Sequence, residues 1–112
     1  MLEHAVRTYP LEGGGFLHVS GMKYTFDAAK PVGKRVTEIT VGTEKLDPKK
    51  SYTIALPDFL VAGGDDFKML MGLKTVRGLG QDVEVVSDYI KSLGAPVSMT
   101  IEGRITILNR GD

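Results

Sequence analysis

The chain has no cysteine among its 112 residues, which excludes disulfide bonds, thiolate zinc ligands and a thiol nucleophile. It also has no net charge, because 14 basic residues balance 14 acidic ones. Nucleic-acid-binding proteins are typically basic, since phosphate contacts supply much of their affinity, so no nucleic acid is expected as a partner. No apolar run approaches the roughly 20 residues of a membrane-spanning helix, so no membrane span is expected.

Glycine is present in excess, with 14 residues in the chain, whereas about 7% is the average usage. The glycines gather in short clusters, notably at residues 13–15 and 63–64. Glycine permits backbone conformations and close approaches that other residues do not. The loops that contain these clusters are therefore the first places to look for a binding site.

The length favours one domain, and the apolar spacing predicts both strands and helices within it. Strands are predicted at residues 16–20, 22–27, 35–41, 51–56, 99–101 and 104–108. Helical spacing is clearest at residues 82–93. The apolar stripe of this helix consists of Val83, Val86, Ile90 and Leu93. Several connections have hairpin length, so the expected fold class is α+β, with mostly antiparallel strands packed with a few helices.

Residues 2–9 also carry apolar side chains at helical spacing, and Pro10 ends the run. No capping residue precedes the first apolar position. Such a beginning is typical of a chain that starts inside a longer helix, and a short first helix that frays gives the same pattern.

Phe16 is the first candidate for ligand binding, because it directly follows the triple-glycine loop of residues 13–15. If residues 16–20 form a strand, Leu17 and Val19 share the aliphatic core face and Phe16 stands on the opposite, polar face. An aromatic ring in that place could stack on a ring of a ligand. The alternative is that Phe16 tucks under the next strand or under the glycine loop.

A second candidate is the turn that follows the strand expected at residues 51–56. It contains Gly63 and Gly64, and Asp65 and Asp66 come directly after them. A carboxylate beside glycines can accept hydrogen bonds from two vicinal hydroxyls, as acidic residues do on ribose. The alternative is a surface turn whose acidic side chains are solvated.

Several sharper motifs are missing from the sequence. The glycine-rich segments lack the Gly-Lys-Ser/Thr of a phosphate-binding loop, and Val83 stands where a dinucleotide-binding motif needs its third glycine. His4 and His18 lack metal-ligand spacing, and the acidic residues lack the spacing of a calcium loop. The residues by themselves therefore predict a binding surface, with no catalytic residue assigned.

The segment from Tyr52 to Phe67, YTIALPDFLVAGGDDF, resembles the C-terminal domain of the 5′-nucleotidase family. Other stretches that match in the same order are residues 2–6, 15–24, 31–36, 46–48 and 101–105. The Gly-Gly-Asp segment and the terminal Glu-Gly-Arg-Ile are fairly specific to the family. The resemblance implies a single domain over residues 1–112 that is an N-terminally truncated fragment of the family's C-terminal domain.

The resemblance implies that this domain holds a nucleoside or nucleotide for a two-metal phosphohydrolase. In the family two Phe rings stack on the base, and they correspond to Phe16 and Phe59. The acidic residue of the Gly-Gly-Asp loop binds the ribose hydroxyls. It corresponds to Asp65, which follows Gly63 and Gly64. Stacking suits this task because every base offers a π-face, worth roughly 1–3 kcal/mol.

Two residues depart from the family pattern. Asp58 occupies the place of an asparagine that typically faces the base, which leaves the preferred base open, and Asp66 stands where glycine is common. In the family, two divalent metals are bound by an N-terminal metallophosphoesterase domain, and this sequence has no comparable set of ligands. The resemblance therefore implies that the fragment alone is inactive and that both metals belong to a missing N-terminal domain.

Two functions remain open at this point. The first is the substrate-specificity domain of a 5′-nucleotidase-like hydrolase of nucleotide catabolism, whose partners are the nucleoside or nucleotide and the N-terminal domain of the same protein. The second is a non-catalytic nucleoside-binding or dimerisation module, since some family members form homodimers through this region. The resemblance also implies a periplasmic, secreted or cell-surface location.

Overall fold

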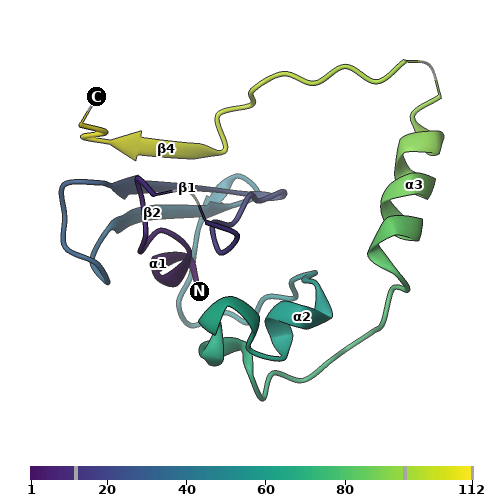
Figure 1. Ribbon diagram of the computed structural model, residues 1–112, viewed down its shortest axis with the longest axis horizontal. Coiled ribbons are helices and arrows are strands. Elements are labelled where there is room, and N and C mark those ends of the chain that lie inside the picture. Colours follow the sequence, from purple (N-terminus) through teal and green to yellow (C-terminus); the bar gives the residue numbers. More distant parts are fainter. Residues whose placement is uncertain (12, 95, 112) are drawn as a thin grey trace.

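A mixed four-stranded sheet forms one side of the molecule, at the left of Figure 1. The computed structural model describes residues 1–11, 13–94 and 96–111. The strand order is β3-β2-β1-β4, with β1 at Met22–Asp27, β2 at Val36–Val41, β3 at Glu44–Lys45 and β4 at Ile105–Leu108. β1 pairs antiparallel with β2 and β2 with β3, whereas β4 joins β1 in parallel.

Most of the helices in the described residues are short. They are α1 (Leu2–Ala5), α2 (Asp58–Val61), the 3₁₀ helices η1 (Gly64–Asp66) and η2 (Lys68–Leu70), and α3 (Asp82–Ser92). The predicted α+β fold class is confirmed, as are the strands expected at residues 22–27, 35–41 and 104–108 and the helix at 82–93. The first helix is shorter than residues 2–9.

Three predicted strands are wrong for the described structure: residues 16–20, 51–56 and 99–101. Along residues 16–20, side chains bond the backbone carbonyls that a neighbouring strand would bond in a sheet. The Tyr24 hydroxyl donates to the Leu17 carbonyl at 2.8 Å, and the Arg104 guanidinium donates to the Val19 carbonyl at 2.9 Å. The other two segments are almost wholly exposed, so their alternation has no neighbouring layer that buries one face.

Two hydrophobic clusters form the core, and α1 contributes to both. One consists of Leu2, Val6, Tyr24 and Phe26, and the other of Ala5, Leu60, Phe67 and Leu70. Helical residues one apart point about 100° from each other, so Ala5 and Val6 reach different clusters. Tyr24 and Phe26 lie on the same face of β1, as the alternation in this strand predicted.

Polar contacts anchor β1 at Tyr24, within the strand, and at Asp27, its last residue. Burial raises the pKa of Tyr24 to about 12, and its hydroxyl bonds a carbonyl of the preceding loop. At the other end, Asp27 Oδ1 accepts hydrogen bonds from Asn109 Nδ2 at 2.8 Å and from the Ala29 N–H at 2.9 Å. The bond from Asn109 is the main cause that lowers the pKa of Asp27. Since Asn109 follows β4, this contact ties the ends of two parallel strands together.

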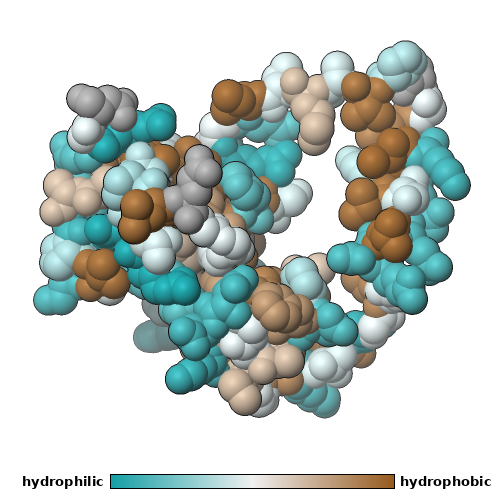
Figure 2. All heavy atoms as spheres, in the orientation of Figure 1, coloured by the Kyte–Doolittle hydropathy of each residue, from teal (hydrophilic) through white to brown (hydrophobic). Residues whose placement is uncertain are grey.

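α3 stands apart from the sheet on an extended arm (Figure 1). Among the described residues of 71–103, all except Ser87 are exposed, including the apolar stripe of Val83, Val86, Ile90 and Leu93. Figure 2 shows an open gap between this arm and the sheet, with hydrophobic residues of α3 at its border. The radius of gyration, 15.6 Å, accordingly exceeds the roughly 13 Å typical of this length. Within the described ranges, no helix is both long and apolar enough to cross a bilayer.

We expect the chain to self-associate through the stripe on α3, because exposed apolar patches of this kind associate in water. Sedimentation velocity at increasing concentration should show a rising sedimentation coefficient. The double variant Val86→Lys with Ile90→Lys should shift the distribution toward monomer. The matched control is the double variant Glu84→Lys with Asp88→Lys, on the polar side of α3, and it should leave association intact. A chain that stays monomeric at every concentration would contradict this expectation.

Candidate functional site

The predicted site residues gather around Asp65, where the loop after α2 meets α1 and the glycine loop of residues 13–15. α2 ends at Val61, and Gly63 follows with a φ of 94°, the left-handed conformation that commonly terminates helices. The Gly63 N–H donates to the Leu60 carbonyl at 3.0 Å, which completes the last turn. This glycine therefore directs the chain from α2 into the acidic loop.

Two successive acidic residues have an unusual backbone. Asp65 has a φ of 51° and Asp66 a φ of 61°, both in the left-handed region. That region costs non-glycine residues roughly 1–2 kcal/mol each, although aspartate is among those that adopt it most readily. Such a conformation persists where neighbouring contacts hold it.

Two side chains of the N-terminal segment hold the Asp65 carbonyl. The His4 Nε2 donates to it at 2.8 Å, and the Arg7 Nη2 donates at 3.3 Å. Because a carbonyl only accepts, the imidazole carries its proton on Nε2 in this contact. The Arg7 Nη1 donates to the His4 carbonyl at 2.7 Å, so one guanidinium links α1 to the acidic loop.

The side chain of Asp65 lies beside the glycine loop that leads to Phe16. A Cβ at Gly14 would lie 3.7 Å from Asp65 Oδ2, and one at Gly15 would lie 3.8 Å from the Asp65 Cβ and 3.3 Å from Arg7 Nη1. Gly15 directly precedes Phe16. The fold thus brings together two segments that are about fifty residues apart in sequence, the acidic loop and the glycine loop before Phe16.

The ring of Phe59 covers Gly64. Phe59 is 57% exposed, and a Cβ at Gly64 would come within 2.5 Å of its ring atoms. A Cβ at Gly63 would lie 2.8 Å from the sulfur of Met71. Both glycines are therefore needed for close packing around the loop, in addition to the left-handed backbone at Gly63. An aromatic ring this exposed is a surface on which a flat ligand can stack.

Phe16 is half-buried, with its ring edge-on to Phe26 at a centroid distance of 6.2 Å and tilted against His18 at 5.5 Å. The expectation that Phe16 stands on the polar face of a strand is wrong, because residues 16–20 form no strand. The ring rests on the first hydrophobic cluster. Asp58 is exposed at the first position of α2, directly before Phe59.

The sequence analysis missed Arg7 and considered His4 only as a metal ligand. The signal available was their spacing: residues three apart on a helix lie on the same face. That spacing gives no partner, however, and only the fold brings the face to Asp65.

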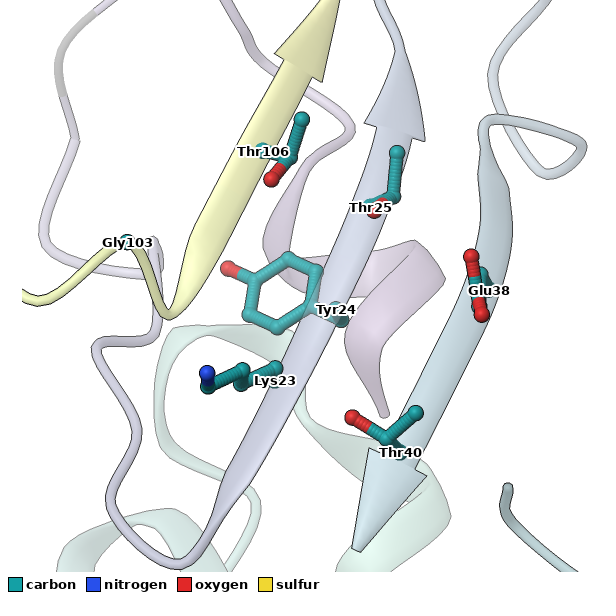
Figure 3. Close-up of a pocket in the computed structure, with 7 residues that line it drawn as sticks. All are labelled: Lys23, Tyr24, Thr25, Glu38, Thr40, Gly103 and Thr106. Atoms are coloured by element: carbon teal, nitrogen blue, oxygen red, sulfur yellow. The ribbon is translucent and has the colours of Figure 1, made fainter. Parts of the chain in front are cut away.

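A shallow pocket of about 240 Å³ lies elsewhere, on the face of the sheet shown in Figure 3. It is lined by Lys23, Tyr24, Thr25, Glu38, Thr40, Gly103 and Thr106. None of the predicted site residues lines it. Within the described part of the chain, no group of three or more His, Cys, Asp and Glu side chains could hold a metal ion.

Comparison with known proteins assigns the domain. Residues 1–72, more than half of the chain, match the family model described as 5′-nucleotidase, C-terminal domain. The chain belongs to the 5′-nucleotidase family. The matched stretch contains every predicted site residue, from Phe16 to Asp65, and the resemblance stated from the sequence is confirmed.

Individual 5′-nucleotidases agree with this assignment. The chain is 35% identical to the snake venom 5′-nucleotidase of Macrovipera lebetinus, over 96% of this chain and 28% of that protein. It is 37% identical to the 5′-nucleotidase of Bos taurus, over 92% of this chain and 19% of that protein. A crystal structure of a 5′-nucleotidase precursor from Thermus thermophilus matches with a TM-score of 0.88 at 37% identity, over 96% of this chain and 22% of that chain. The chain thus spans less than a third of each relative.

The two phenylalanines of the acidic loop should respond differently to truncation. Phe67 is fully buried, so Phe67→Ala should lower the free energy of unfolding by about 3–5 kcal/mol. Phe59 is more than half exposed, so Phe59→Ala should change it by under about 1 kcal/mol. Urea denaturation followed by circular dichroism measures both. A larger loss for Phe59→Ala would show that this ring is a core residue.

Proposed function

We propose that this chain binds the nucleoside part of a nucleotide for a 5′-nucleotidase-type phosphohydrolase. Phe59 and Phe16 stack on the base, and Asp65 accepts hydrogen bonds from the two ribose hydroxyls. Gly63 and Gly64 leave room for the Met71 sulfur and the Phe59 ring, so they determine where the stacking ring lies. The observation that carries the proposal is the position of the Asp65 carboxylate beside the glycine loop that leads to Phe16.

The two rings differ in what they offer to a base. Phe59 is free on its outer side, where a base can cover it and remove apolar surface from water. Phe16 is held in place by Phe26 and presents only the part of its ring that the core leaves uncovered. Phe59 therefore supplies most of the stacking surface, and Phe16 limits the depth to which the base enters.

Asp58 contributes to the choice of base. A carboxylate accepts hydrogen bonds and donates none, whereas the asparagine typical of the family does both. Asp58 thus favours a base that presents N–H groups to it, such as the amino group of adenine or the N–H edge of guanine.

In this proposal the catalytic steps belong to a metallophosphoesterase domain with two divalent metals, elsewhere in a longer protein. The described residues contain no side-chain group that fits such a centre, so no catalytic step is derived for this chain. A periplasmic, secreted or cell-surface location is part of the same proposal. One relative supports this location, because it is named a snake venom 5′-nucleotidase and venom proteins are secreted.

A second candidate function is a dimerisation or interaction module. The observation that favours it is the apolar stripe on α3, which the other described residues leave exposed. The two functions are compatible, since the stripe and the Asp65 loop lie on different elements.

Titration calorimetry with nucleosides tests the proposal. Adenosine or guanosine should bind, and Phe59→Ala should weaken binding by about 1–3 kcal/mol, the usual value of one stacked base. The matched control is Tyr89→Ala, which removes another exposed ring, on α3, and should leave the affinity unchanged.

The role of Asp65 is tested with a second ligand. 2′-Deoxyadenosine should bind more weakly than adenosine, and Asp65→Ala should remove that difference. A chain that binds no nucleoside, or binds equally after Phe59→Ala, would refute the proposal.

The chain alone should not hydrolyse AMP in the presence of Mn²⁺ or Zn²⁺, because two-metal hydrolysis requires several carboxylate and imidazole ligands around the metals. Phosphate release by the purified chain measures this. Activity that a substitution within the chain abolishes would show that the assignment to a substrate-binding role is incomplete.

A further inference from the structure

Arg7 lies at the meeting point of three segments. Its guanidinium bonds the His4 carbonyl at 2.7 Å and the Asp65 carbonyl at 3.3 Å, and Nη1 lies 3.3 Å from where a Cβ of Gly15 would stand. These segments are the N-terminal helix, the acidic loop and the glycine loop before Phe16. The guanidinium therefore bonds the acidic loop and lies close to the glycine loop.

His4 is the second residue whose side chain bonds the Asp65 carbonyl. Its Nε2 donates to Asp65 at 2.8 Å, and its ring meets the buried ring of Phe67 edge-on at 4.5 Å. The imidazole thus cannot move away from the loop without losing a packing contact. Together, His4 and Arg7 place two donors on the carbonyl of a residue whose backbone is left-handed.

We propose that His4 and Arg7 are positioning residues: they hold the left-handed Asp65 so that its carboxylate faces the glycine loop before Phe16. The proposal rests on the proposed role of Asp65 in binding ribose. Neither side chain needs to touch the ligand, because both act on the backbone of the residue that does. Without their donors, the Asp65 loop relaxes toward ordinary backbone angles and the binding-competent arrangement becomes a smaller fraction of the population.

The chain offers matched variants for this test. His4→Phe keeps a ring against Phe67 but removes the donor, whereas His4→Gln keeps an N–H donor and removes the ring. Arg7→Met keeps the aliphatic stem and removes both donors. Glu3→Ala is the control for a general loosening of α1, because Glu3 bonds the N–H groups of Arg35 and Val36 and not the acidic loop.

Amide hydrogen exchange reads the loop directly, whether or not a ligand binds. The Phe67 N–H donates to the Gly64 carbonyl at 3.1 Å, across Asp65 and Asp66, so its exchange reports opening of this turn. Arg7→Met and His4→Phe should accelerate it about fivefold to tenfold, in line with the loss of one hydrogen bond. His4→Gln should restore most of the protection. The Tyr24 N–H, bonded to the Arg104 carbonyl in the sheet, is the internal reference and should not change.

Nucleoside affinity then tests the link to the ligand. Arg7→Met should weaken adenosine binding about fivefold to tenfold, and most of this loss should vanish in an Asp65→Ala background, because the two residues act as a unit. Equal losses in both backgrounds would mean that Arg7 contacts the ligand itself, which overturns the positioning role. Unchanged exchange at Phe67 in both donor-removing variants would also overturn it. If the unaltered chain binds no nucleoside while the exchange results hold, the function of the site is wrong and the loop restraint stands.

Discussion

The rest of the structure depends on the way α1 is held between the two hydrophobic clusters. Leu2 and Val6 enter one cluster and Ala5 enters the other, so a helix of four residues joins two parts of the core. Polar side chains of α1 also make tertiary contacts. The Glu3 carboxylate accepts the N–H groups of Arg35 and Val36 at 3.0 and 2.7 Å. Since an isolated helix this short is unstable in water, these tertiary contacts are what keep it folded.

The binding surface proposed here uses the same helix. The face of α1 that does not enter the core carries His4, and Arg7 lies two residues after the end of α1 at Ala5. Both reach the acidic loop, whose left-handed residues need such support. The arrangement couples local stability to function, because contacts that dock α1 against the sheet also determine where Asp65 lies. The donors of His4 and Arg7 bind the backbone of Asp65 and leave its side-chain oxygens for other groups.

α3 differs from the other elements because tertiary packing does not support it. It is an amphipathic helix of 11 residues with no buried residue, so its intrinsic propensity and its own backbone hydrogen bonds are its main support. Regions with few buried apolar contacts open most easily. The match to the Thermus thermophilus structure covers 96% of this chain and so includes the arm that carries α3. The extended course of the arm is therefore shared with a protein of which this chain spans only 22%.

What the sequence determined by itself was local. The alternation of Tyr24 and Phe26 predicted β1, the spacing along residues 82–93 predicted α3, and the Gly-Gly-Asp segment carried the family resemblance. These signals depend on neighbouring residues and on the period of the backbone, so they can be read without a fold. The same signals failed at residues 16–20, where the hydroxyl of Tyr24 and the guanidinium of Arg104 satisfy carbonyls that a neighbouring strand would otherwise bond.

Only the tertiary structure decided how the candidate site is assembled. Nothing in the order of residues indicates that Arg7 reaches Asp65, or that the glycine loop before Phe16 lies against the Asp65 carboxylate. These contacts join segments about fifty residues or more apart, and they depend on how α1 packs between two clusters. Periodicity likewise predicted the stripe on α3 but not its exposure, because burial is decided by what lies opposite a face and not by the face itself.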